Sequence, residues 1–237
     1  MNDKMSIFID GAECSASAGQ SILQAADEAG IYIPRLCHQP DLRPNGSCRV
    51  CTVKANGRNV AACTTPVADG MIIENEIEEI AELRRALIEM LFVEGNHYCP
   101  FCEKSGNCEL QAIAYRLRIM APRFPYQFPA RQLDASHQAI FIDGNRCIQC
   151  GRCVRAAEQI DKKPVLGFIG RGGAMRIKAS SSSGLAGVDI GPEDACVKSC
   201  LVGCIIVKDT AYRTPIGRRT YDHEPIGSDI EARRGRG

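Results

Sequence analysis

The sequence predicts an α+β fold made of several small units, on three observations. Residues 5–17, MSIFIDGAECSAS, alternate between apolar and polar side chains around Asp10–Gly11, as expected of a β-hairpin. From Ile77 to Gly95 the apolar residues instead recur at helical spacing. The 14 cysteines among 237 residues include several C-x2-C pairs, and that spacing lets two thiolates converge on one ion or cluster.

The first unit, residues 1–78, is predicted to be a small sheet of the β-grasp kind. After the hairpin, GQSILQAADEAG has one apolar helical face and ends at Gly30. A proline-containing loop follows. CRVCTVKANGRNVAAC then indicates two short strands around Asn56–Gly57, and GMIIEN indicates a further strand.

The second unit, residues 79–136, is predicted to be helical and to end in a linker. The helix that begins near Ile77 leads to a second group of cysteines, and CELQAIAYRLRIM indicates another helix. Residues 121–137 contain three prolines and are expected to be extended. A third unit, residues 137–207, follows, with the polar surface loop SSSSGLAG at its centre.

The last segment, residues 208–237, has much charge and no periodicity. Alone, such a segment is expected to be disordered. The alternative is a tail that orders against a partner subunit. Both interpretations stay open, and the segment is assigned as an extended partner-binding tail.

The composition limits the classes of partner and the cellular compartment that we expect. The 29 basic and 28 acidic residues give no indication of nucleic acid or an anionic membrane as the main partner. The N-terminal stretch has no apolar region of the secretory kind, and the longest apolar runs are too short to span a bilayer. We therefore expect a cytoplasmic protein whose cysteines are reduced thiolate ligands rather than disulfides.

The first group of cysteines has four members with C-x10-C-x2-C-x11-C spacing. By count alone, four thiolates suit a tetrahedral zinc ion or a [2Fe–2S] cluster. The loop between the first two cysteines is rich in turn residues, so its backbone N–H groups can wrap around cluster sulfides. We therefore favour an iron–sulfur site formed by Cys37, Cys48, Cys51 and Cys63.

The second group, in GNHYCPFCEKSGNC, supplies three cysteines, one ligand short of a [4Fe–4S] site. His97 stands two residues before the first of them, and its imidazole completes the set if it binds; otherwise it is an ordinary surface or packed histidine. A zinc site with the same four ligands is the competing interpretation. The predicted ligands are His97, Cys99, Cys102 and Cys108.

The third group, CIQCGRC, begins like a bacterial ferredoxin run, but Ala157 stands where the fourth cysteine belongs. In the two-cluster pattern that fourth cysteine binds the other cluster. The substitution therefore indicates a lost neighbouring cluster. The remaining ligand should come from SCLVGCIIV, where Cys200 precedes an apolar strand.

The predicted set is Cys147, Cys150, Cys153 and Cys200. Cys196 or Cys204 is the alternative to Cys200 as fourth ligand. Otherwise both are small buried residues left from the lost cluster. Cys14 has no cysteine neighbours, and a buried free thiol is expected there.

No catalytic centre is visible in the sequence. GFIGRGGAM matches a nucleotide-binding loop poorly and is expected to be a turn between strands. No serine, histidine and aspartate triad or pair of catalytic carboxylates is evident. A protein with several clusters and no substrate pocket is most simply an electron relay.

The segments CRVCTVKANGR, FVEGNHYCPFCEKSGNCELQ, CIQCGRC and PIGRRTYDHEPIGSDIEARR together resemble one family. It comprises the N-terminal region of the complex I large iron–sulfur subunit, the same region of iron-only hydrogenases, and the diaphorase small subunits of soluble NAD-reducing [NiFe] hydrogenases, which the chain resembles most. The family commonly has H-x3-C where this chain has H-x-C, and a proline where this chain has Leu201.

The resemblance implies a β-grasp [2Fe–2S] domain, a [4Fe–4S] segment with one histidine and three cysteine ligands, and a degenerate two-cluster ferredoxin domain. It also implies partners: a flavin- and NAD-binding diaphorase subunit on one side, and hydrogenase small and large subunits on the other. The expected function is electron transfer that links H2 oxidation to NAD reduction. The alternatives are a subunit of a complex I-like or formate dehydrogenase assembly, and a structural zinc-binding module.

Overall fold

The first hairpin forms where the alternating sequence predicts it. The computed structural model describes residues 4–234, in which β1 (Lys4–Ile9) and β2 (Ala12–Ser17) pair antiparallel. Asp10 and Gly11 take the turn with φ of 50° and 80°, the left-handed conformations that a two-residue hairpin loop needs. The inward side chains of β1, including Ile7 and Ile9, are fully buried.

The first unit is a five-stranded sheet covered by one helix. β3 (Thr52–Ala55), β4 (Arg58–Ala61) and β5 (Ile72–Glu74) complete it in the order β2-β1-β5-β3-β4, with β1 and β5 parallel. α1 (Ile22–Glu28) starts at a capping box, in which Ser21 and Gln24 satisfy each other's backbone N–H groups. This sheet is the one that the sequence predicts for residues 1–78.

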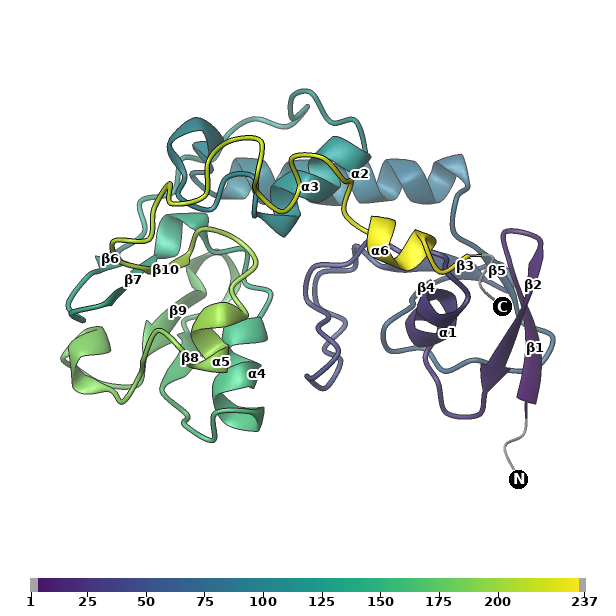
Figure 1. Cartoon of the computed structure of the whole chain (residues 1–237), viewed down its shortest axis with the longest axis horizontal. Coiled ribbons are helices and arrows are strands. Elements are labelled where there is room, and N and C mark those ends of the chain that lie inside the picture. The colour runs from purple at the N-terminus through teal and green to yellow at the C-terminus, as the bar shows by residue number, and fades with distance from the viewer. Residues whose placement is uncertain (1–3, 235–237) are drawn as a thin grey trace.

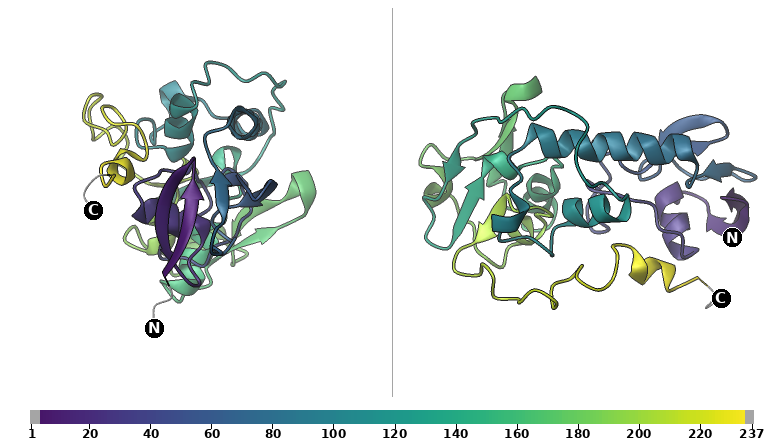
Figure 2. Two further views of the ribbon diagram at one scale, coloured as in Figure 1. Left: turned by 90° about the vertical axis from the view of Figure 1, so that its right-hand side faces the viewer. Right: turned by 90° about the horizontal axis from the view of Figure 1, so that it is seen from above.

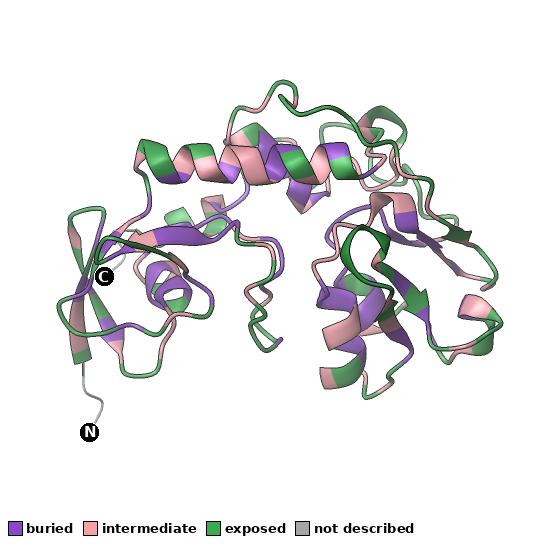
Figure 3. Cartoon of the chain, turned by 180° about the vertical axis from the view of Figure 1, so that it is seen from behind, coloured by how far each residue is buried: buried purple, intermediate pink, exposed green. Residues whose placement is uncertain are grey.

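The second unit is built on α2 (Glu78–Glu94), which runs across the top of both lobes in Figure 1. A 3-10 turn (Cys99–Phe101) and α3 (Glu109–Arg116) follow. Arg84 fixes α2 to the first unit, because its buried guanidinium donates to the backbone carbonyls of Thr52 and Asn75. Buried and exposed residues alternate along α2, as Figure 3 shows, so one side of the helix packs on the lobes.

The third unit has two small sheets and two short helices. One sheet has the order β10-β7-β6, and the other pairs β8 with β9. Along the chain these elements are β6 (Leu133–Asp134), β7 (Ile140–Asp143), α4 (Arg152–Gln159), β8 (Leu166–Ile169), β9 (Arg176–Ala179), α5 (Ala195–Lys198) and β10 (Ile205–Val207). Most of the glycine-rich stretch 167–175 lies in β8 and the turn that joins it to β9, as the sequence predicts.

The hydrophobic residues form two cores. One lies between the first sheet and α1. The other joins α2, α3 and the whole third unit, and it also takes in Tyr32, Leu36 and Leu42 from the first unit's loop. The second and third units therefore share one core, although the sequence places them in separate segments.

The tail lies against its own chain. It runs along one long side of the molecule from the third unit back to the first, as Figure 2 shows, and ends in α6 (Ser228–Glu231). Thr220 donates to the Asn107 side chain, and Arg116 of α3 forms an ion pair with Glu231. Gly227 packs so closely on Tyr32 that a Cβ would lie 2.3 Å from its ring. Binding of this tail to a partner stays a prediction.

None of the helices within residues 4–234 has the length and apolarity needed to cross a membrane.

Candidate metal centres

The first group of predicted ligands comes together at the edge of the first unit. Cys37, Cys51 and Cys63 are buried and Cys48 is half-buried. The Cys37 thiol lies within hydrogen-bonding reach of Cys48 and Cys63, and these contacts hold the pKa of Cys37 well below its usual value. The Cys37 backbone N–H also donates to the Cys48 sulfur at 3.4 Å. A hydrogen bond with Cys63 likewise lowers the pKa of Cys51, to about 7. Converging sulfurs, two of them favoured as thiolates, fit a cluster site.

The backbone of the Cys37–Cys51 loop explains how it encloses the sulfurs. Gly46 and Arg49 adopt φ of 65° and 57°, so the chain turns tightly on both sides of Cys48, the second cysteine. A Cβ on Gly46 would lie 3.2 Å from Thr64, directly after Cys63. The loop therefore closes over the segment that carries the fourth cysteine, as expected from its turn residues.

The second group lines a small cavity between α2, α3 and the third unit. Its wall includes His97, Cys99, Cys102 and Cys108. His97 Nε2 is buried and has no hydrogen-bond partner among the described residues. Burial, followed by the charges of Arg146 and Arg131, lowers the pKa of His97 to about 4, so the ring is neutral near pH 7. A neutral, unpaired nitrogen on a ring that lines the same cavity as three thiols fits a metal ligand.

Two glycines make room at the second site. A Cβ on Gly95 would lie 2.5 Å from His97 Nε2, and one on Gly203 would lie 2.6 Å from Cys102 Sγ. Gly203 belongs to the third unit, so this unit forms part of the wall of the second site. The H-x-C spacing brings His97 to the cavity despite the shorter separation from Cys99.

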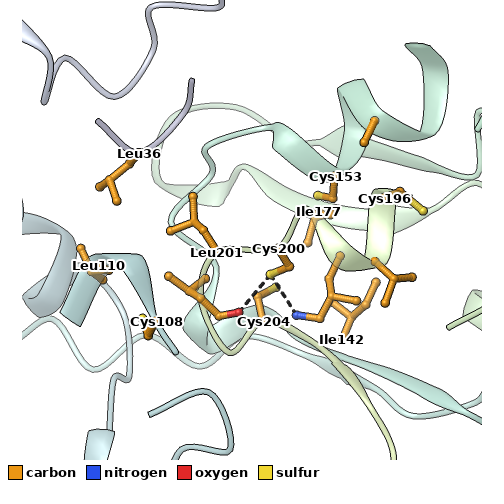
Figure 4. Packing of buried hydrophobic residues seen from close by; sticks show 14 of the residues in the cluster. Leu36, Cys108, Leu110, Ile142, Cys153, Ile177, Cys196, Cys200, Leu201 and Cys204 are labelled. Atoms are coloured by element: carbon orange, nitrogen blue, oxygen red, sulfur yellow. Dashed lines mark hydrogen bonds between the residues drawn. The ribbon is translucent and has the colours of Figure 1, made fainter. Parts of the chain in front are cut away.

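The third group joins the loop before α4 to the end of α5. Burial raises the pKa of both Cys150 and Cys153, and the charge of Cys200 adds to the increase in both; it also acts on Cys147, so Cys200 lies close to all three. The Ile205 N–H donates to Cys200 Sγ at 3.3 Å, one of the contacts drawn in Figure 4. The Gln149 N–H donates to Cys147 Sγ at 3.4 Å. Backbone donors to sulfur are typical of cluster ligands.

Cys196 and Cys204 lie in different surroundings. Cys196 is on α5 beside Asp161, and burial followed by this carboxylate raises its pKa to about 12. Cys204 is buried against the sulfurs of Cys147 and Cys200. Figure 4 shows Cys204 next to Cys200 and Cys196 well apart from both. Cys14, on β2, is buried in the first core, as expected.

Sequence reasoning missed two arginines that join the sites. Arg155 of α4 donates to the carbonyls of Cys37 and Arg43 and, at 3.5 Å, to that of Cys150. It therefore touches a predicted ligand residue of the first site and one of the third. No local pattern marks it, because two of its three partners, Cys37 and Arg43, lie more than 100 residues away.

Arg146 joins the third site to the second. It immediately precedes Cys147, and its Nη1 lies 3.7 Å from Cys102 Sγ and 3.4 Å from the Gly203 carbonyl. Ion pairs with Glu103 and Asp143 hold the guanidinium in place. In space the third site therefore contacts both the first and the second site. In the sequence, by contrast, the second site lies between the first and the third.

Three family models match the chain, one for each unit. They are a 2Fe-2S iron–sulfur cluster binding domain at residues 2–77, an NADH-ubiquinone oxidoreductase-G iron–sulfur binding region at 84–123, and the ferredoxin-like domain of NADH-quinone oxidoreductase subunit 3 at 138–189. The gamma subunit of the NAD-reducing hydrogenase HoxS of Cupriavidus necator is 40% identical over 223 residues, which cover 93% of this chain and 94% of that one. The chain belongs to this family of iron–sulfur subunits.

Two further relatives place the family more widely. The mitochondrial 78 kDa subunit of NADH-ubiquinone oxidoreductase from Candida albicans is 32% identical over 89% of this chain, which spans only 29% of that longer protein. A crystal structure of an NAD+-reducing [NiFe]-hydrogenase in the H2-reduced state contains a chain with 42% identity and a TM-score of 0.92, covering 97% of this chain and 98% of that one. The resemblance and the fold class predicted from the sequence are confirmed.

Membership in the family also decides the type of cofactor. The matched regions correspond to one [2Fe–2S] and two [4Fe–4S] clusters, the number and types that the sequence predicts. The match of all three units to iron–sulfur families favours clusters over the zinc interpretation.

Proposed function

We propose that this chain relays single electrons between a hydrogenase module and a flavin- and NAD-binding diaphorase subunit, so that H2 oxidation drives NAD reduction. The observation that carries the proposal is the contact of the third site with both others through Arg155 and Arg146. The nearly full-length likeness to the gamma subunit of an NAD-reducing hydrogenase supports the identity of the partners.

The proposed ligands are those that the fold brings together. They are Cys37, Cys48, Cys51 and Cys63 for the [2Fe–2S] cluster; His97, Cys99, Cys102 and Cys108 for one [4Fe–4S] cluster; and Cys147, Cys150, Cys153 and Cys200 for the other. When bound, each cluster accepts and releases one electron. The chain's own residues exclude water, hold each sulfur in place and donate hydrogen bonds to it.

The arginine contacts favour the order first, third, second for electron passage, in either direction. Arg155 fixes the loop of Cys37 against the start of α4, and Arg146 fixes the 3-10 turn before Cys147 against Cys102. Because both guanidiniums are positive, they favour additional negative charge at the sites that they touch. Each is therefore suited to stabilise a reduced neighbour.

We propose that the chain has no catalytic centre of its own and that reactions with H2 and NAD take place in partner subunits. Each predicted ligand lies in one of the three sites, and no sequence pattern for nucleotide binding or a nickel–iron centre accompanies them. A cytoplasmic location suits 14 free cysteines, because a reducing compartment keeps thiols available as ligands.

The relay is tested in the purified complex with Cys51→Ser, and Cys14→Ser serves as the matched buried control. We expect Cys51→Ser to abolish H2-driven NAD+ reduction. The two half-reactions, NADH oxidation by ferricyanide and H2 oxidation by benzyl viologen, should both continue, because they need only one end of the complex. Cys14→Ser should retain all three activities. Unchanged coupled activity in Cys51→Ser would show that electrons bypass this chain.

The alternative is an electron-transfer subunit of a complex I-like or formate dehydrogenase assembly, which the shared family keeps open. The catalytic subunit that copurifies with the chain distinguishes these possibilities. A nickel–iron subunit supports the proposal, and a molybdenum-containing or quinone-linked partner contradicts it.

A further inference from the structure

The third site holds five cysteines rather than four. Cys204 has 2% of its surface exposed and lies immediately before β10. Its thiol is within hydrogen-bonding reach of two proposed ligands, Cys147 and Cys200. The Cys204 side chain therefore lies inside the third site, next to the sulfurs of both Cys147 and Cys200.

The backbone holds Cys204 firmly in this position. Its carbonyl accepts a hydrogen bond from Asp143 N at 2.7 Å, and the next residue, Ile205, pairs with Ile142 of β7. On the other side, Gly203 lies against Cys102 of the second site. The turn that connects Cys200 to Cys204 is thus fixed at both ends, and the two sulfurs occupy neighbouring positions.

A packing role alone does not explain the thiol. An alanine at this position would leave the backbone contacts unchanged and would suit a small buried site. Cys196, four residues before Cys200, is also buried but faces Asp161 instead. The two extra cysteines of this segment therefore differ: one faces the cluster ligands and the other faces away.

We propose that Cys204 is a reserve ligand of the third site, able to bind the cluster iron when Cys200 does not. In that event the bond between the iron and Cys200 Sγ would break, the Cys200 thiolate would take up the proton that the neighbouring Cys204 thiol gives up, and Cys204 Sγ would bind the same iron; no electrons are gained or lost. A thiolate replaces a thiolate, so the charge of the site is unchanged. The inference rests on the ligand set in the proposed function.

The test compares variants of the whole complex by iron and acid-labile sulfide content and by low-temperature EPR after reduction. Cys200→Ala should retain the wild-type iron content, whereas Cys200→Ala/Cys204→Ala should lose about four irons, one [4Fe–4S] cluster. Cys200→Ala/Cys196→Ala is the matched control and should behave like Cys200→Ala. An equal loss of iron in Cys200→Ala and in the Cys200/Cys204 double variant would overturn the inference.

A second comparison does not depend on assembly of the double variant. If Cys204 binds the iron, Cys200→Ala and Cys200→Ser should give the same EPR signal, because the residue at position 200 is no longer a ligand in either. If serine oxygen binds instead, the two signals will differ, and the inference is wrong. Failure of the proposed function would look different: the wild-type complex itself would lack the third cluster's signal.

Discussion

The first unit has a core of its own, whereas the second and third units share one. The four cysteines of the first site lie within 27 residues, on loops that adjoin β3 and β4 of one sheet. The third site instead joins residues that are 47 positions apart in the sequence, and Gly203 of that unit forms part of the second site. The comparison indicates that one cluster is held by a self-contained domain and the other two by a joint structure. Damage to the shared core should therefore affect two sites together.

The largest expected effect comes from the shared core itself. Ile140 of β7 is fully buried there, and Ile140→Ala should cost about 2–5 kcal/mol of unfolding free energy. Both [4Fe–4S] signals should weaken in EPR while the [2Fe–2S] signal persists. Ile7→Ala, in the first core, is the matched change. It should weaken the [2Fe–2S] signal and leave both [4Fe–4S] signals in place. Loss of all three signals in both variants would contradict the separation of the cores.

A smaller effect is expected where α3 and α4 meet. Buried Arg152 donates to both carboxylate oxygens of Glu109 at 2.7 Å. Glu109→Gln leaves a buried guanidinium without its counter-charge, and we expect a loss of about 2 kcal/mol, because Glu109 is partly exposed. Thermal unfolding monitored by cluster absorbance measures it. Glu193→Gln, in an exposed ion pair on α5, should change the stability by less than about 1 kcal/mol.

Arg146 tests the contact between the second and third sites. Its positive charge near Cys102 stabilises the reduced state, so Arg146→Met should lower the potential of the second cluster. A lost interaction of about 1.4 kcal/mol corresponds to about 60 mV for one electron. Redox titration followed by EPR measures the shift, with Arg176→Met on the exposed part of β9 as control. If the [2Fe–2S] potential shifts and that of the second cluster does not, the contact between Arg146 and the second site is contradicted.

Arg155 tests the contact between the separate domain and the shared structure. Arg155→Lys retains the positive charge but removes the two-pronged guanidinium that donates to the Cys37 and Arg43 carbonyls. We expect the lost hydrogen bonding to lower the free energy of unfolding by about 1 kcal/mol. We expect a several-fold slower H2-driven NAD+ reduction with unchanged half-reactions and unchanged iron content. Equal rates in the variant and the wild type would show that this contact does not limit transfer.

The sequence predicted the elements and most of the proposed ligands because these depend on local pattern. The hairpin of residues 5–17, the helix after Ile77 and the C-x2-C pairs each follow from neighbouring residues. Ala157 was interpreted as the mark of a lost neighbouring cluster, and it is fully buried in the shared core. The small Ala157 side chain packs among the apolar residues of this core.

Other features depend on contacts between distant segments. The sequence left Cys196, Cys200 and Cys204 as alternatives, and only the packing of α5 and β10 against α4 places Cys200 near all three partners and Cys196 beside Asp161. It left His97 open as well. The structure places this ring in the wall of the cavity that the three thiols also line, with a buried Nε2 that has no partner among the described residues, and ligation by His97 stays a prediction.

By itself, then, the sequence determined the cluster types and the family, and it predicted the division into units. Spacing and periodicity act over a few residues, and those features are local. Tertiary structure alone decided that Cys200 and Cys204 approach the third site while Cys196 faces Asp161, which sites touch through Arg155 and Arg146, and that the second and third units share a core. These features arise when segments up to 118 residues apart pack together to bury apolar surface, and no local pattern encodes that packing.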